Sequence, residues 1–514
     1  MSFAVVAPST GPTSPTSAAL CPAPDAVGLL SGYGAKASAA GSVPYDELLD
    51  GGGQPRTGCQ AVVDWLQQQT TGQLQQLHQA AAGHFLREGI TFTVYTDASN
   101  TERSIPFDLI PRIIAAREWQ VLERGCTQRI RALNAFLHDI YHGQDILRAG
   151  VVPMQQVLGN EGYQPWMIGV DLPGQTYAQI SGIDLVRNHE GQYYVLEDNL
   201  RTPSGVSYLI EGRRISEQVL GSVLQHLPVR PVDVYPQLLR QTLSECAFAG
   251  EDEPLIVVLT PGRFNSAYFE HAFLAREMQV PLVTGSDLYV DRGCVYLKSV
   301  AGPRRVGVIY RRVDDPFLDP LAFKPDSMLG VPGLMAAYRA GQVAIVNAPG
   351  TGIADDKSIY PYVENMIEFY LGEKPILNNV PTHQCRKPED LAYVLAHLSE
   401  LVVKETQGSG GYGMLVGPAA TQEELNTFRA LIEANPDQYI AQPTLSLSTC
   451  PTLVEQGIAP RHIDLRPFVL SSPEAVRVLP GGLTRVALRE GSLVVNSSQG
   501  GGVKDTWVLS GDAS

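Results

Sequence analysis

The spacing of apolar positions predicts that the first third of the chain is mainly helical. Between residues 107 and 143, apolar side chains recur at intervals of three and four, as on the buried face of a helix, and His142-Gly143 predicts its end. We therefore expect residues 41–150 to form a helical region. Residues 1–40 are rich in Pro, Ser, Thr, Ala and Gly, which bury too little apolar surface to fold, so we expect a disordered tail there.

A β-hairpin is predicted at residues 182–205, "GIDLVRNHEGQYYVLEDNLRTPSG". If its turn is centred on residues 190–191, Asp184 and Glu197 lie directly opposite each other, with Cβ atoms roughly 5 Å apart. Asn199 is two residues beyond Glu197 and therefore lies on the same face of the hairpin.

The middle and last parts of the chain are predicted to contain two kinds of sheet. After a helix at 212–227 and a linker at 230–237, strands alternate with helices, which favours a largely parallel α/β layer. Its expected strands lie at 255–260, 305–313 and 341–350, and its helix at 266–278. Alternating apolar positions and glycine-rich turns then predict a mainly antiparallel sheet. Its expected segments are 400–417, 439–446, 461–470 and 481–502.

Composition narrows the class of protein. A chain of 514 residues is too long for one core, and about two to four domains are expected. The net charge of −15, with no cluster of Lys or Arg, argues against a nucleic-acid partner. Seven scattered cysteines without a CxxC pair predict reduced thiols in the cytoplasm rather than a disulfide framework or a structural zinc site. No run of 18 apolar residues occurs, so no membrane partner is expected.

The acids of the predicted hairpin are candidates for a metal site. Two carboxylates and an amide oxygen on one face suit Mg²⁺, whose remaining ligands come from substrate phosphates. Without a cation the paired charges would repel each other and one pKa would rise. Residues 193–196 are apolar on both strand faces, which predicts a buried strand and favours the metal over a solvated acidic turn. His138 and His142 are also spaced to bind a metal ion from one face of a helix. No third ligand is near, so we interpret them as two polar residues at a helix end.

A second group of candidates lies more than 200 residues later. Glycines in "GSGGYG" (408–413) let backbone amides approach phosphate oxygens, although a hairpin turn explains them equally well. Helix-opening GxGxxG and GKS patterns are absent, which argues against a Rossmann or Walker site. Lys404 in "LVVKET" is flanked by apolar residues, so it is expected to be buried against an anion unless it snorkels to solvent. Arg466 and Arg485 on strands suit phosphate or carboxylate, with a solvated sheet face as the alternative.

Together these motifs resemble the circularly permuted ATP-grasp family, type 2, which is related to the synthetase domain of glutathionylspermidine synthetase. The phrases "SIPFDLIPRII", "VLEDNLRTPSGVSY", "VNAPGTGIADDK" and "KETQGSGGYGM" carry the resemblance, which runs from about residue 45 to the end. In ordinary ATP-grasp proteins the lysine and the glycine-rich lid precede the acids, whereas here the acids come first. The resemblance implies an α/β (α+β) permuted ATP-grasp fold with a mainly helical N-terminal region. Its divisions would be a metal-binding segment at 151–228, an α/β substrate domain at 229–350 and ATP-binding subdomains at 351–514.

The resemblance also implies roles for the matching positions. The expected metal ligands are Asp184, Glu197 and Asn199. The expected nucleotide contacts are Lys357, Lys404, the lid residues Gly408, Ser409, Gly410, Gly411, Tyr412 and Gly413, and Gln442 beside the adenine. Arg466 and Arg485 would stabilise the transferred phosphoryl group. The acceptor site would be bordered by Arg201, Ser204, Gly205, Arg311 and Arg312.

The function implied by the resemblance is an ATP- and Mg²⁺-dependent carboxylate–amine ligase that acts through an acyl phosphate. Its partners would be small-molecule or peptide carboxylates and amines, for example glutamate with cysteine, by analogy to relatives. Two alternatives stay open, namely phosphoryl transfer to a non-carboxylate acceptor and a nucleotide-binding partner protein without turnover. The oligomeric state is equally open.

Overall fold

The largest sheet joins strands from both ends of the chain. The computed structural model describes residues 29–30, 33–34, 43–96, 99–248, 253–408, 413–496 and 500–511, so most of the expected tail lies outside it. The sheet has eight strands, seven of them in the order β13-β5-β4-β19-β20-β21-β3, with β18 also paired to β19. In that order the seven are Asn378–Asn379, Tyr193–Asn199, Ile180–Arg187, Gly457–Ser471, Val476–Val486, Gly502–Val508 and Phe107–Ile114, and β18 is Thr449–Val454. Neighbours pair antiparallel except β13 with β5 and β21 with β3, which confirms the antiparallel expectation for the last third.

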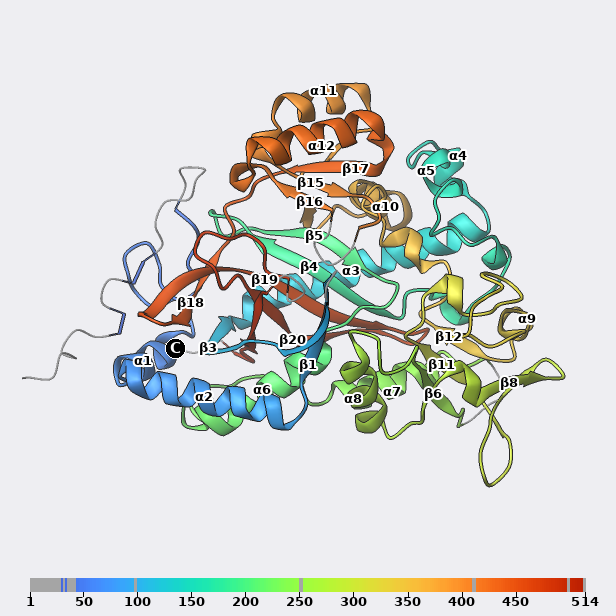
Figure 1. Cartoon of the computed structure of the whole chain (residues 1–514), viewed down its shortest axis with the longest axis horizontal. Helices are drawn as coiled ribbons and strands as arrows, with labels where there is room; N and C mark the ends of the chain where they lie inside the picture. The colour runs from blue at the N-terminus through green and yellow to red at the C-terminus, as the bar shows by residue number, and fades with distance from the viewer. Residues whose placement is uncertain are drawn as a thin grey trace, which may run out of the picture.

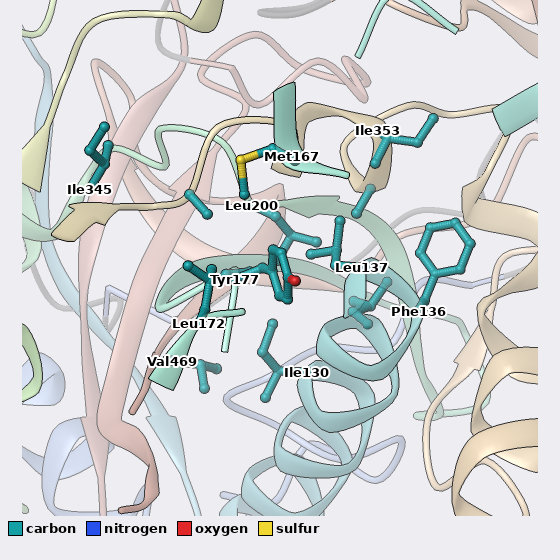
Figure 2. Packing of buried hydrophobic residues seen from close by; sticks show 14 of the residues in the cluster. Ile130, Phe136, Leu137, Met167, Leu172, Tyr177, Leu200, Ile345, Ile353 and Val469 are labelled. Carbon is teal, nitrogen blue, oxygen red and sulfur yellow. The ribbon is translucent and has the colours of Figure 1, made fainter. Parts of the chain in front are cut away.

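Helices cover both faces of this sheet (Figure 1). The long helix α3 (Ala116–Tyr141) packs on one face, where Ile183 and Leu185 of β4 enter its core. Figure 2 shows Ile130 and Leu137 of α3 gathered around Tyr177 within this core. Helices α6 (Val206–Leu224) and α2 (Thr71–Arg87) lie against a second core on the other face. The shorter helices are α1 (Gln60–Gln67), α4 (Asp145–Arg148), α5 (Met154–Leu158) and α10 (Val363–Leu371).

The expectation of a helix from residue 107 onward is wrong for its first eight residues. Residues 107–114 form strand β3, and α3 begins only at Ala116. Pro111 explains the difference, because a proline inside a helix removes a hydrogen bond and clashes with the preceding turn. It lies in the stretch where the pairing of β3 with β21 shifts register, the kind of position where a sheet tolerates proline. The predicted helix end is confirmed, since α3 stops at Tyr141. The N-terminal region also contains a β1–β2 hairpin, Thr91–Thr96 and Ser99–Ser104.

A four-stranded parallel sheet confirms the predicted α/β layer. Its order is β12-β11-β6-β7, with strands Ala344–Val346, Val308–Arg311, Ile256–Leu259 and Leu282–Val283, and each neighbouring pair is parallel. Helices α7 (Tyr235–Glu245) and α8 (Tyr268–Met278) pack beside it. The linker expected at 230–237 is therefore too long, because α7 begins at Tyr235 with Pro236 in its first turn. This layer also carries α9 (Leu334–Arg339) and a small sheet of β8 (Leu288–Asp291), β9 (Cys294–Leu297) and β10 (Arg304–Arg305).

The third unit is a four-stranded antiparallel sheet with two helices, at the top of Figure 1. Its order is β14-β17-β15-β16, with strands His383–Gln384, Tyr439–Pro443, Leu401–Glu405 and Met414–Val416. Helices α11 (Pro388–Ala396) and α12 (Gln422–Ala434) share its apolar core. This unit presents Lys404 toward the β4–β5 hairpin, so the two candidate groups of the sequence face each other.

Candidate active site

The β4–β5 hairpin brings its two acids into register through a bulge. Asp184 is paired with Glu197, as predicted, but Arg187 is paired with Tyr193, one residue out of the register expected for the turn. The pairing shifts between Asp184 and Leu185, which leaves Leu196 as the extra residue. Without this bulge Asp184 would lie opposite Leu196 and Glu197 would point to the other face.

Asp184 is fully buried and bound by two arginines. Arg466 donates to both of its carboxylate oxygens, with Nη2 at 2.8 Å from Oδ2, and Arg485 Nη2 lies 2.6 Å from Oδ2. Arg485 also binds Asp464 through Nε at 3.0 Å. Burial alone would raise the pKa of Asp184, but the charges of Arg466 and Arg485 outweigh burial and hold this pKa well below its usual range. The two arginines therefore supply the positive charge without which the paired acids would repel each other.

Glu197 and Asn199 remain more open than Asp184. The Glu197 side chain is 27% exposed, its Oε2 lies 3.9 Å from Lys357 Nζ and its Oε1 lies 4.0 Å from Arg466 Nη2. Asn199 Nδ2 donates to Gly182 O at 3.2 Å, which leaves its amide oxygen for a ligand. Strand β5 is only half-buried, contrary to the buried strand expected from its apolar residues.

Lys404 is a buried cation that binds an amide rather than a carboxylate. Its Nζ donates to Gln442 Oε1 at 2.8 Å, and Gln442 Nε2 donates to Thr382 Oγ1 at 3.0 Å. Burial lowers the pKa of Lys404 to about 8, although the nearby charge of Glu197 partly opposes the shift. Within the described residues no carboxylate lies within ion-pair distance of Lys404, so its charge is available to an anion.

Lys357 connects the hairpin to the glycine-rich loop. Besides its approach to Glu197, Lys357 donates from Nζ to Gly408 O and from its backbone N to Thr406 O at 3.0 Å. Gly413 has φ +66°, a conformation that favours glycine, where the loop enters the next strand. The start of the loop, Gly408, is therefore linked to Glu197 through Lys357. The remaining lid residues, Ser409, Gly410, Gly411 and Tyr412, lie outside the described residues.

The expected acceptor residues gather at the start of α6. Ser204 Oγ accepts a hydrogen bond from Arg312 Nη2 at 2.5 Å, and Ser204 O accepts one from Arg466 Nη1 at 3.2 Å. The next residue, Gly205, has φ +116° and donates its N–H to Glu270 Oε2 at 2.7 Å. The α/β layer thus meets the Asp184 site through Arg312, Ser204 and Arg466.

Arg201 lies beside two acids that the sequence analysis did not single out. Its Nε is 3.6 Å from Asp314 Oδ1 and 3.7 Å from Asp355 Oδ2. Asp355 is buried and accepts N–H bonds from Leu200 and Arg201. Burial raises the pKa of Asp355 to about 6. The phrase "GTGIADDK", which contains Asp355, was the available signal.

Arg311 has a different environment from the one expected. Its side chain is fully buried, donates to the backbone oxygens of Asn347, Val313 and Ala348, and pairs with Asp315 at 2.7 Å. These contacts anchor the loop after β12 and leave no face of Arg311 toward an acceptor. Arg312 therefore belongs to the candidate site, whereas Arg311 does not.

The comparison with family models decides the family. The model for circularly permuted ATP-grasp proteins of type 2 matches residues 111–487. The chain belongs to this family. The permuted order explains why the acids on β4 and β5 precede the lysines in the sequence and yet share a site with them.

Relatives of this ATP-grasp protein are similar over most of its length. A Synechocystis protein of uncharacterized function is 52% identical over 467 residues, covering 91% of this chain and 97% of that protein. A Frankia alni protein with the provisional name of a glutamate–cysteine ligase is 44% identical, covering 90% of this chain and 54% of that protein. Among solved structures, a glutathione synthetase-like effector from Globodera pallida has a TM-score of 0.53 at 13% identity, covering 86% of this chain and 98% of that one. This last likeness shows the fold.

Mg²⁺ is the metal that the ATP-grasp family implies, and the donor set fits it in part. The carboxylate of Glu197 and the amide oxygen of Asn199 are hard ligands of the kind that Mg²⁺ prefers. Asp184 is fully buried and already binds Arg466 and Arg485, so it is less available as a metal ligand than Glu197 and Asn199. Within the described ranges, no three His, Cys, Asp or Glu side chains are arranged to hold a metal ion.

His138 and His142 lie close together at the C-terminal end of α3. Their ring centroids are 4.2 Å apart, and His142 Nε2 lies 3.2 Å from Asp171, as expected for polar residues at a helix end.

No helix in the described part of the chain has the length and apolar character needed to cross a bilayer.

Proposed function

We propose that this ATP-grasp protein is an ATP-dependent carboxylate–amine ligase. The observation that carries the proposal is the position of Arg466, which bridges the two halves of the site. It binds Asp184 on the nucleotide side and the backbone oxygen of Ser204 on the acceptor side, 4.0 Å from Glu197. A cation placed between a phosphate site and an acceptor site suits the transfer of a phosphoryl group from one to the other.

The proposed reaction has two steps. A carboxylate oxygen of the acid attacks the γ-phosphorus of ATP, the bond from that phosphorus to the bridging oxygen breaks, and ADP leaves. The nitrogen of the amine then attacks the acyl carbon and loses a proton, and phosphate leaves, which yields an amide. Bound Mg²⁺ would neutralise charge on the phosphates.

The chain's own residues would position and stabilise these groups. Lys357 and Lys404 would hold the phosphates, with the loop at 408–413 above them and Gln442 near the base. Glu197 and Asn199 would hold the metal, with Asp184 keeping both arginines in place. Arg201, Ser204 and Arg312 would border the acid.

The names of two relatives support this reaction class. Frankia alni and Frankia casuarinae proteins, 44% and 43% identical to this chain, carry provisional names as glutamate–cysteine ligases. The chain spans about half of each of them. Glutamate with cysteine is therefore the first pair of substrates to examine, followed by other amino acids and short peptides.

The experiment measures ADP release across this panel and traps the intermediate with hydroxylamine. An acyl phosphate yields a hydroxamate, whereas a phosphate ester formed by phosphoryl transfer to a hydroxyl does not. Lys404→Ala should abolish both signals, and Lys387→Ala, an exposed lysine of the same unit, should leave them unchanged. ADP release without hydroxamate would refute the proposed ligase reaction. Full activity in Lys404→Ala would refute the proposed location of the active site.

A further inference from the structure

A cavity lies on the face of the large sheet that is turned away from Asp184. It has a volume of about 340 Å³, within the range of small-molecule pockets. Arg187 lines it and lies three positions from Asp184 on β4, hence on the opposite face. The other walls come from the start of α3, which includes Glu118, and from residues 45–59 of the N-terminal segment.

The base of this cavity is a fixed arrangement of buried charges. Glu47 is 4% exposed and accepts from Arg112 at 2.7 Å and from Arg187 Nη1 at 2.9 Å. Arg187 is 8% exposed, and its Nη1 also donates to Glu118 Oε1 at 3.0 Å. Because both partners of each contact are held, the lining is formed before any ligand arrives.

Two guanidinium groups in the lining of the cavity keep unused donors. Arg56 and Arg187 lie over the ring of Tyr45, with their central carbons 3.7 and 3.9 Å from its centroid. Arg56 donates a hydrogen bond from Nε to Asp46 O. Arg187 donates from Nε to Gly191 O and from Nη1 to Glu47 Oε2. Among the described residues, the terminal nitrogens of Arg56 and Nη2 of Arg187 have no hydrogen-bond acceptor. A carboxylate is the group that such paired guanidinium donors bind best.

The acids of the lining select against a polyanion. Glu118 Oε1 accepts hydrogen bonds from Arg187 and Tyr193, whereas its Oε2 has no partner among the described residues. Asp50 is exposed at the rim. Arg112 and Arg187 already neutralise Glu47, so Glu118 and Asp50 remain as carboxylates beside the guanidinium groups of Arg56 and Arg187. A phosphate would meet these carboxylates, whereas an ammonium group beside a carboxylate would match both kinds of charge.

We propose that this cavity is a second ligand site for a zwitterion, a free α-amino acid or a short peptide. Its carboxylate binds Arg56 and Arg187, and its ammonium group binds Glu118. The proposal follows from the lining alone and does not depend on the ligase activity.

The test is calorimetric titration of the full chain without nucleotide. The probes are L-glutamate, glycylglycine, γ-glutamylcysteine and inorganic phosphate, and the tightest zwitterion is then compared with its N-acetyl and carboxamide forms. Each blocked form should bind roughly tenfold or more weakly, because a charged hydrogen-bonded pair is lost. Phosphate that binds more tightly than every zwitterion, or no binding by any zwitterion, would overturn the proposal.

Variants then separate this cavity from the active site. Arg56→Gln should weaken binding roughly tenfold or more. Thr57→Trp fills the rim and leaves every charged residue of the lining in place, and it should weaken binding to the same extent. Arg124→Gln, an exposed arginine further along α3, is the matched control and should bind normally. Lys404→Ala should also bind normally. If Lys404→Ala lost binding while Arg56→Gln and Thr57→Trp kept it, the ligand would occupy the active site and the proposal would be wrong.

Discussion

Arg129 of α3 and Asp198 of β5 form a doubly hydrogen-bonded ion pair that is almost completely buried. Nε and Nη2 of the arginine each lie 2.7 Å from a carboxylate oxygen, and Nη1 donates to Asn379 Oδ1 at 2.8 Å. Asp198 lies between Glu197 and Asn199 and therefore points to the other face of β5. The pair therefore holds β5, which carries Glu197 and Asn199, against α3.

Removing this pair should destabilise the protein far more than removing a surface charge. Arg129→Leu leaves the carboxylate of Asp198 buried without a partner, so we expect the free energy of unfolding to fall by about 3–5 kcal/mol. Urea unfolding measures the loss. The control is Arg131→Leu, an exposed arginine of the same helix, expected to change stability by less than about 0.5 kcal/mol. Similar losses in both variants would contradict a special role for the buried pair.

Asp184 and Glu197 should respond differently to the loss of charge, although they lie opposite each other. Asp184→Asn leaves two arginines without their shared counter-charge, so we expect a loss of stability of about 3 kcal/mol or more together with a loss of ADP release. Glu197→Gln changes a partly exposed side chain and should reduce ADP release with a stability change of about 1 kcal/mol or less. Unfolding curves and ADP release on the same preparations separate the two effects. Equal stability losses would mean that the arginines do not depend on Asp184.

The pKa of Lys404 predicts how nucleotide affinity changes with pH. Burial lowers this pKa to about 8, and phosphate binding requires the protonated form. Affinity should therefore be constant below pH 8 and should fall as pH rises above 8, until the pKa of the bound state is reached. Titration of ADP between pH 6.5 and 9.5, a range chosen around the value of about 8, measures the profile. Lys404→Arg stays charged across this range and should flatten the curve, so a wild-type profile in this variant would assign the titration to another group.

The sequence was most informative where local pattern decides structure. Register arithmetic placed Asp184 opposite Glu197, but the structure reaches this pairing with a turn centred on Glu190 and a bulge at Leu196, which no periodicity reveals. The prediction of a helix from residue 107 was wrong because apolar spacing alone does not take account of Pro111. Alternating strands and helices predicted the parallel sheet correctly.

The partners of Asp184 were the part that local pattern could not supply. Arg466 is 282 residues from Asp184 and Arg485 is 301 residues away, so both contacts depend on how β4 pairs with β19 and β19 with β20. The sequence therefore assigned the acids to Mg²⁺ alone, and the structure shows that two arginines already bind the buried acid, Asp184. Glu270 was missed for the same reason, because its partners lie on α6, more than 60 residues earlier in the chain.

Glu270 of α8 should affect the acceptor side of the site more than the nucleotide side. Its Oε2 accepts from Gly205 N at 2.7 Å, Ser207 N at 3.1 Å and Ser207 Oγ at 2.9 Å, so it caps the first turn of α6 from another unit of the fold. Its Oε1 lies 3.4 Å from Arg312, which in turn holds Ser204. A carboxylate at this end of a helix is stabilised by the unpaired N–H groups and by the helix dipole.

Glu270→Gln keeps one acceptor oxygen but removes the charge, so the segment around Ser204 should lose its fixed position. With any acid and amine that support ADP release, we expect the KM of the acid to rise roughly tenfold while the KM of ATP changes by less than about twofold. Steady-state kinetics with each substrate varied in turn measures both values. Glu277→Gln removes the same charge from the same helix, where it pairs with Arg214, and should leave both KM values unchanged. A parallel rise in both KM values for Glu270→Gln would show a general loss of structure, and an unchanged KM of the acid would place the acceptor elsewhere.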